Sequence, residues 1–181
     1  MEKLLGQERQ GLSAIFQARV ANYLTLPGGT LGYTREWLDA QGPAKGDAEW
    51  KCLSEALYFE ARGESVSGQF AVAEVILNRV DSPNYPNTIC GVITQGTGVK
   101  YGCQFSYACD GHPEVIAEPR AFERVGKIAN IMVNGAARPL TDGATHYHTR
   151  SVSPRWARSF PRTAAIGMHY FYKQPTRLTQ N

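Results

Sequence analysis

The clearest hydrophobic pattern in the chain is a stripe at helical spacing in its second quarter. Trp50, Leu53 and Leu57 are three and four residues apart, so they lie on one face of a helix. Asp47 is an N-cap residue type suited to begin this helix, and Gly63 is suited to follow its end. We therefore expect a helix between these two residues with one face in the core.

The pattern continues beyond the glycine into a second helix. Ser65 or Ser67 is suited to begin it, because a serine side chain accepts a hydrogen bond from a free backbone N–H of the first turn. The apolar face of this helix consists of Val66, Phe70, Ala73, Leu77 and Val80. The two helices would meet at a corner near residue 63.

Two more helices are predicted downstream. A short one begins at Asn87 or Thr88 and runs to Gln95. A longer one begins at Pro119, a residue type favoured at the first helical position, and ends at Gly135. The apolar face of the longer helix consists of Phe122, Val125, Ala129 and Met132.

Near the C-terminus the hydrophobic period changes to two. Residues 145–149 (THYHT) and 169–172 (HYFY) alternate in the manner of short strands. The stretch 150–163, which contains proline and several arginines, would bridge them. The predicted fold class is therefore α+β, mostly α, with a small β element near the C-terminus.

Residues 1–46 differ from the rest of the chain. A helical segment at about 8–24 is followed by Pro-Gly-Gly at 27–29, a short piece at 34–40 and a glycine-containing linker. We expect an N-terminal helical arm and linker over 1–46 and one main domain over residues 47–181. The arm would dock on that domain or on a protein partner.

Composition supports one globular domain of ordinary size. The 181 residues are 43% hydrophobic and 19% charged, and the net charge of +3 is far below that of a dedicated nucleic-acid-binding protein. No apolar run is long enough for a membrane span. Arg19 interrupts the apolar stretch from Leu12 to Leu26, so no signal peptide is expected in this chain.

The four cysteines are Cys52, Cys90, Cys103 and Cys109, which allow three pairings. No CxxC spacing occurs, which argues against a zinc knuckle. Cys103 and Cys109 bracket a short loop and could close it, and Cys52 would then pair with Cys90. Disulfides would indicate an oxidising compartment. Four buried thiols fit the sequence equally well.

Glu60 is the most unusual polar residue of the first helix, because it follows Leu57 on the apolar stripe. Burial disfavours the ionised form of a carboxyl group and so raises its pKa. A carboxyl group that keeps its proton near neutral pH can serve as a general acid. The structural alternative is a glutamate at the edge of the stripe that reaches solvent.

Several sequence blocks resemble one known family. In order along the chain they are FEARGESVSGQFAVAEVILNRV, YPNTICGVI, CQFS, GATHYHT, PRWAR and IGMHYFY. Together they resemble the SleB-type cell-wall hydrolases, the spore-cortex-lytic enzyme family, over about residues 50–173. The resemblance implies a lysozyme-like or lytic-transglycosylase-like domain, peptidoglycan glycan strands as the partner, and a periplasmic, extracellular or particle-associated location.

The resemblance also implies that Glu60, the first glutamate of the E-A-R-G-E block, is the catalytic acid. A two-carboxylate glycosidase needs a second Asp or Glu. The candidates are Glu64 and Asp110, and neither has a convincing position in the sequence. We therefore expect a single glutamate, without a cofactor, acting in a lytic transglycosylase or a muramidase.

Further side chains are candidates for sugar binding, because amides, hydroxyls and imidazoles form hydrogen bonds with sugar hydroxyls. They are Glu64, Gln104, Ser106, His146, Tyr147, His148 and Tyr172. Phe105, which lies between two of them in the cysteine-bracketed loop, is expected in the core.

Two other functions remain open at this point. His146 and His148 form an HxH pair, and His169 could complete a zinc site in a peptidoglycan amidase or endopeptidase. Such enzymes also need an upstream His and Asp, but seven residues after His112 stands Pro119, so the pattern fails and we expect no metal. A non-catalytic wall-binding or assembly module is the third possibility.

Overall fold

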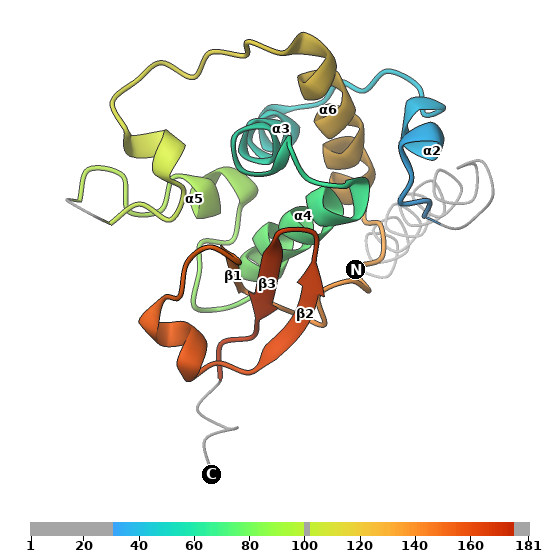
Figure 1. Ribbon diagram of the computed structural model, residues 1–181. Coiled ribbons are helices and arrows are strands. Elements are labelled where there is room, and N and C mark those ends of the chain that lie inside the picture. The colour runs from blue at the N-terminus through green and yellow to red at the C-terminus, as the bar shows by residue number, and fades with distance from the viewer. Residues whose placement is uncertain (1–30, 100–101, 176–181) are drawn as a thin grey trace, which may run out of the picture.

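The computed structural model describes residues 31–99 and 102–175, and it is mostly helical with one small sheet (Figure 1). The elements are α2 (Arg35–Asp39), α3 (Ala48–Ala61), α4 (Val66–Val80), α5 (Ile89–Ile93), the 3-10 helix η1 (Ser106–Cys109), α6 (Pro119–Val133), β1 (His146–Thr149), the 3-10 helix η2 (Arg155–Arg158), β2 (Arg162–Ile166) and β3 (His169–Tyr172). The predicted α+β, mostly α class is confirmed.

Helix α3 forms as its sequence pattern predicts. The Asp47 side chain accepts a hydrogen bond from the Trp50 backbone N–H at 3.0 Å, and Leu53 and Leu57 are completely buried. The Trp50 indole N–H donates to the Gly126 carbonyl of α6 at 2.9 Å. A Cβ at residue 126 would lie only 3.1 Å from the Trp50 ring, so the glycine allows α3 and α6 to pack closely.

The corner between α3 and α4 is closed by polar contacts. The buried Gln69 side chain donates to the carbonyls of Ala61 at 3.2 Å and Arg62 at 3.3 Å, which satisfies the end of α3. Gly63 follows this end as predicted but does not adopt a positive φ. Ser65 begins α4 by accepting the Gly68 N–H at 3.1 Å.

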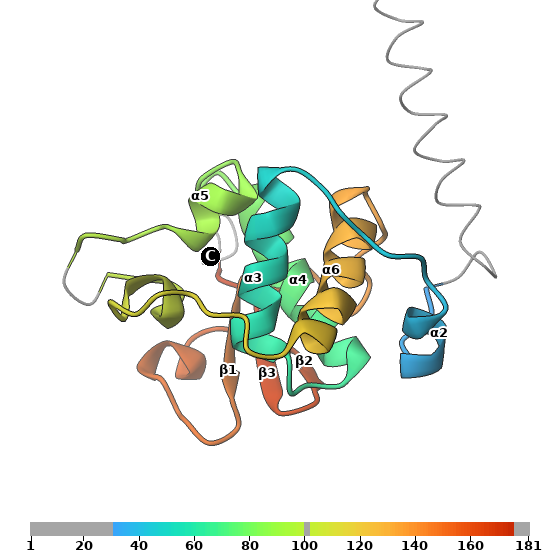
Figure 2. The same ribbon diagram turned by 90° about the horizontal axis from the view of Figure 1, so that it is seen from above.

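Helix α4 lies between the other helices and the sheet (Figures 1 and 2), which explains why it is buried on more than one face. Its predicted stripe packs in the main core with α3 and α6. On another face, Ala71 and Val75 pack with Ala144 and Phe171, and this second cluster joins α4 to the sheet. The sheet therefore rests on the helix that follows the corner.

The sheet has three antiparallel strands in the order β1-β3-β2. Strands β1 and β3 were predicted, and Tyr147 pairs with Phe171 in their register. Strand β2 was not predicted, because Arg162 and Thr163 end an arginine-rich stretch and the RTAAI segment does not alternate clearly. Gly167, with φ of +56°, makes the turn from β2 to β3.

The remaining predicted helices are confirmed with small changes of length. Thr88 caps α5 by accepting the Gly91 N–H at 3.0 Å, but this helix ends at Ile93 rather than Gln95. Helix α6 begins at Pro119, and Gly135 follows its end with φ of +88°.

The described part of the N-terminal arm packs on the helical body. Leu38 of α2 is completely buried, and the Lys127 ammonium of α6 donates to the Asp39 carbonyl at 3.1 Å. The predicted helix at 8–24 lies outside the described residues, and the boundary at residue 47 stays a prediction. None of the helices in the described ranges has the length and apolar character needed to cross a membrane.

Two disulfides join the cysteines in the favoured pairing. Cys52 of α3 pairs with Cys90 of α5, with their Cα atoms 5.3 Å apart. Cys103 pairs with Cys109 at a Cα–Cα distance of 6.4 Å. This bond closes the short loop of residues 103–109, which contains η1. The first bond ties α5 to the helix that carries Glu60.

We predict that replacing Cys52 and Cys90 together by serine lowers the free energy of unfolding by about 4 kcal/mol, because the bond closes a longer loop in the unfolded chain. The same change at Cys103 and Cys109 should cost only about 2 kcal/mol. The sequence separations are 38 and 6 residues. Urea unfolding of both variants measures the difference, and the reverse order would contradict the prediction.

Candidate active site

A cavity of about 390 Å³ lies where the end of α3, helix α4, the disulfide-closed loop and strand β1 meet. Its lining residues are Glu60, Arg79, Gln104, Phe105, His146, Tyr147, His148, Thr149, Val152, Trp156 and His169. Among these described residues Glu60 is the only Asp or Glu, and Arg79 is the only Lys or Arg.

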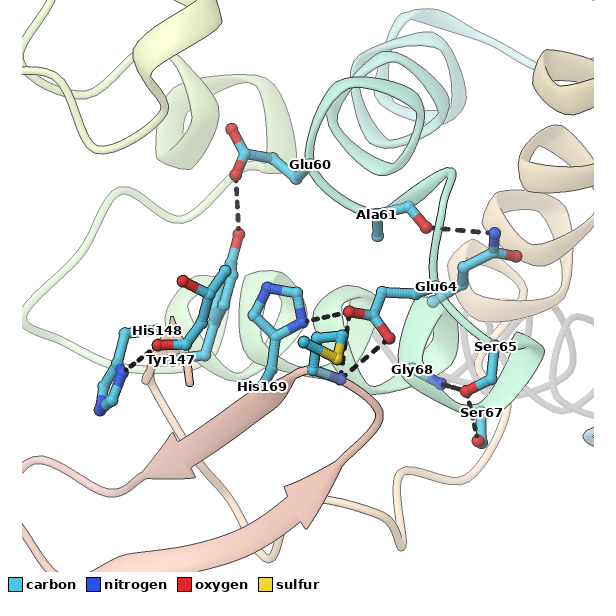
Figure 3. Close-up of polar contacts among 12 residues, drawn as sticks. Glu60, Ala61, Glu64, Ser65, Ser67, Gly68, Tyr147, His148 and His169 are labelled. Carbon is cyan, nitrogen blue, oxygen red and sulfur yellow. Dashed lines mark hydrogen bonds and ion pairs between the residues drawn. The ribbon is translucent and has the colours of Figure 1, made fainter. Parts of the chain in front are cut away.

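Glu60 stands one residue before the end of α3 and is half-buried (Figure 3). Burial raises the pKa of its carboxyl group above the ordinary value, as the sequence analysis expected for this stripe. The hydrogen bond from the Tyr147 hydroxyl and the positive charge of Arg79 act in the opposite direction and limit that rise. Burial is the largest of these effects, so the net shift of the Glu60 pKa is upward.

Tyr147 reaches from β1 toward the end of α3, and its hydroxyl donates to Glu60 Oε2 at 3.3 Å (Figure 3). Burial, followed by the nearby Glu60 charge, raises the pKa of the Tyr147 phenol well above its usual value. The phenol therefore keeps its proton and stays a donor. Its ring packs edge-on against the His169 ring at 5.2 Å, which fixes its direction.

Arg79 of α4 is a site residue that the sequence analysis missed. Its side chain is buried, and Nε donates to the Thr145 carbonyl at 2.7 Å. Burial lowers the pKa of the guanidinium, and a negative charge on Glu60 opposes this effect. The one sequence signal was a lone arginine within the apolar pattern of the second helix, and such a residue is usually solvated.

His146 and His148 line the cavity beside Trp156, and Tyr147 reaches Glu60 from between them. The His146 ring packs at 5.0 Å from the Trp156 ring. Burial, and secondly the charge of Arg79, lowers the pKa of His146 to about 4, so this ring is neutral at neutral pH.

His148 is fixed on both ring nitrogens. Nδ1 lies 2.8 Å from the Thr149 carbonyl, which can only accept, so Nδ1 carries the proton. In the neutral ring Nε2 then accepts from the Tyr172 hydroxyl at 3.0 Å. Tyr172 itself is buried and does not line the cavity, so it contacts the site through His148.

Glu64 does not line the cavity with Glu60. Its carboxylate accepts the Met168 N–H at 3.2 Å and lies 3.0 Å from Nδ1 of the buried His169 (Figure 3). It therefore ties the α3–α4 corner to the turn between β2 and β3. Burial lowers the pKa of His169, and Glu64 opposes this effect.

The disulfide-closed loop divides its residues between two cavities. Gln104 and Phe105 line the Glu60 cavity, and Phe105 is buried as expected. Ser106 lines a neighbouring cavity of about 870 Å³ together with Asp110. Of the two carboxylates considered as partners of Glu60, neither lines its cavity.

The histidines do not gather into a metal site. Within residues 31–99 and 102–175, no group of three or more His, Cys, Asp or Glu side chains is arranged to hold a metal ion. His148 uses both nitrogens within the fold, and His169 contacts Glu64. A zinc ion on these side chains would displace contacts that hold the sheet.

The family model described as cell wall hydrolase matches residues 63–172. The chain belongs to the cell wall hydrolase family. The match spans the α3–α4 corner, α4, the disulfide-closed loop and the sheet, and it begins three residues after Glu60. The resemblance seen in the sequence blocks is thereby confirmed.

Curated relatives in this family include two spore cortex-lytic enzymes. The one from Bacillus subtilis strain 168 is 32% identical over 121 residues, which cover 67% of this chain and 36% of the relative. The one from Bacillus cereus strain ATCC 14579 is 33% identical over 67% of this chain and 42% of its own length. The chain thus matches less than half of the length of each of these relatives.

Two solved structures share the fold. The catalytic domain of the germination-specific lytic transglycosylase SleB from Bacillus anthracis is 32% identical with a TM-score of 0.57, and the match covers 74% of this chain and all of that domain. The catalytic domain of the Bacillus cereus SleB protein is 28% identical with a TM-score of 0.54, over 74% of this chain and 98% of that domain. The lysozyme-like fold class is confirmed.

Glu60→Gln is expected to leave the protein at least as stable as the wild type at pH 8. The folded state binds the Glu60 proton more tightly than the unfolded chain does, and this tighter binding stabilises the folded state. The stabilisation is complete below pH 4.5 and is lost as pH rises through the raised pKa of Glu60. A neutral glutamine avoids that loss and can still accept from Tyr147. Thermal unfolding at pH 8 and pH 4.5 measures the effect.

Glu64→Gln is the matched control for this experiment. It removes one carboxylate oxygen from a site where both oxygens are engaged by Met168 and His169, and should lower stability by roughly 1–2 kcal/mol. A Glu60→Gln protein that unfolds at a clearly lower temperature than the wild type at pH 8 would contradict the account of Glu60.

Proposed function

We propose that this protein cleaves the glycan strand of peptidoglycan between N-acetylmuramyl and N-acetylglucosaminyl residues, with Glu60 as the general acid. The observation that carries the proposal is the half-buried Glu60 carboxyl in a cavity, with its pKa raised by burial. Membership of the cell wall hydrolase family and the names of the relatives, spore cortex-lytic enzymes and a lytic transglycosylase, support the same substrate class.

In the first step the Glu60 proton passes to the glycosidic oxygen while the bond from that oxygen to the anomeric carbon breaks. An oxocarbenium-like centre develops on the muramyl sugar, and Glu60 becomes a carboxylate. In the second step the 6-hydroxyl of the same sugar attacks the anomeric carbon, and its proton returns to Glu60. The product is a 1,6-anhydro ring, and no water is consumed.

The carboxylates around the cavity favour transglycosylation over hydrolysis with two carboxylates. Glu60 is the only Asp or Glu among the described lining residues. Glu64 is engaged at the corner by His169 and Met168, and Asp110 lines the neighbouring cavity. A mechanism in which one glutamate acts first as acid and then as base needs no other carboxylate.

The substrate contacts that we propose follow from the cavity lining. Gln104 and His146 would form hydrogen bonds with the sugars, and the Trp156 ring would stack on a pyranose face. Both ring nitrogens of His148 are engaged within the fold, so His148 would contact the sugars through its ring alone. Tyr147 would hold Glu60 in position. Ser106 would contact the glycan strand in the neighbouring cavity. Glu64 would act indirectly by holding the α3–α4 corner, and Tyr172 would act indirectly by holding His148.

The cellular setting is part of the proposal. Two disulfides fit an oxidising compartment, so we propose that the domain at residues 47–181 acts on the wall in the periplasm, outside the cell or on a particle. Docking of the N-terminal residues on a protein partner stays a prediction.

Zinc-dependent cleavage of wall peptides is the second candidate, motivated by the HxH pair at His146 and His148. A chelator separates the two proposals, since loss of activity that zinc restores would move the chemistry to these histidines. Cleaved amide bonds rather than glycosidic bonds in the digest would do the same.

Glu60→Gln is expected to lower the rate of digestion of purified sacculi by roughly 1000-fold, because the glutamine has no proton to donate. Mass spectrometry of the wild-type digest should find 1,6-anhydro-muramyl ends. Glu123→Gln, an exposed change on α6 outside the cavity, is the control and should retain activity. Undiminished digestion by Glu60→Gln would end the proposal, and binding without any digestion by the wild type would favour a non-catalytic module.

A further inference from the structure

Arg79 is a buried arginine whose burial the fold alone does not explain. Only 5% of its surface is exposed, and its Nη1 is buried without an acceptor among the described residues. The hydrogen bond from Nε to the Thr145 carbonyl, at 2.7 Å, is the one hydrogen bond of its side chain among the described residues. A guanidinium can donate five hydrogen bonds, so most of its capacity is unused.

The surroundings of Arg79 make this burial costly. None of the ion pairs among the described residues includes Arg79. Its guanidinium instead lies over the rings of Tyr85 at 5.4 Å and Phe105 at 5.6 Å. Taking a charge out of water without a paired counter-charge is expensive, so a buried, unpaired arginine in a cavity is a candidate for a functional role.

The charged and titratable groups around Glu60 leave Arg79 as the cavity's source of positive charge. From β1, His146 is neutral at neutral pH and Tyr147 keeps its proton. From the disulfide-closed loop, burial raises the pKa of the Tyr107 phenol, which therefore also stays neutral. His148 of β1 and His169 of β3 complete the titratable lining.

We propose that Arg79 is a positioning residue for Glu60. Its guanidinium supplies the positive charge that stabilises the Glu60 carboxylate once the proton has left. The inference rests on the proposed role of Glu60. A cavity that only excluded water would favour proton retention and would oppose the first step. Arg79 makes the ionised state accessible, and Tyr147 assists by donating to the same carboxylate.

Arg79→Gln tests this inference. Removing a positive charge disfavours the carboxylate, so the Glu60 pKa should rise by roughly 1. Carbon-13 NMR of labelled glutamate side chains measures this pKa directly, with the Glu60 signal identified by its loss in Glu60→Gln. The measurement needs no turnover, so it stands even if Glu60 proves not to be the catalytic acid.

Activity gives the second readout. Glu60 must be protonated to act as the acid, so activity falls as pH rises through its pKa, and the higher pKa in Arg79→Gln should move this decline to higher pH by roughly 1. The rate at the optimum should fall roughly 10-fold. Arg79→Lys keeps the charge and should keep the wild-type pH profile, and Arg120→Gln, an exposed change on α6, is the charge-matched control.

An unchanged or lower Glu60 pKa in Arg79→Gln would overturn the inference, as would equal pH profiles for Arg79→Gln and Arg79→Lys. If Arg79→Gln does not fold, Arg79→Met provides an uncharged variant with an apolar side chain. Its Glu60 pKa, and its pH profile compared with that of Arg79→Lys, then test the inference in the same way. A Glu60 pKa that shifts as expected in a protein without glycan-cleaving activity would support the inference and end the proposed function.

Discussion

The closed corner between α3 and α4 is the constraint on which the rest of the structure depends. Gln69 satisfies the last carbonyls of α3, and Glu64 ties the corner to the turn between β2 and β3. Glu60 stands one residue before the end of this helix. Its carboxyl therefore meets the sheet at a fixed position, and Tyr147 of β1 can reach it.

This position creates an electrostatic balance at a single carboxyl group. Burial favours the protonated form of Glu60, which an acid needs before it reacts. Arg79 and Tyr147 favour the ionised form, which the acid becomes after it reacts. Because His146 stays neutral, it adds no competing charge at neutral pH. The polar groups around Glu60 thus fit a residue that gives up a proton and takes it back.

Much of this arrangement could be predicted from the sequence, because helical periodicity and capping are local. Asp47, Ser65 and Pro119 mark the starts of three helices that the structure contains. Strand β2 was missed because its pairing with β3 is non-local and its own sequence does not alternate. Arg79 was missed for a related reason, since only the fold shows that a charged residue of α4 lines the same cavity as Glu60.

A crystal structure of Glu60→Gln with a peptidoglycan glycan fragment bound tests most directly whether Glu60 delivers the proton. If Glu60 is the general acid, the amide of residue 60 will lie roughly 2.6–3.2 Å from a glycosidic oxygen, the distance needed for proton transfer. The sugars should occupy the cavity that Trp156 and Gln104 line. A glycan bound with every glycosidic oxygen out of reach of residue 60 would contradict the account.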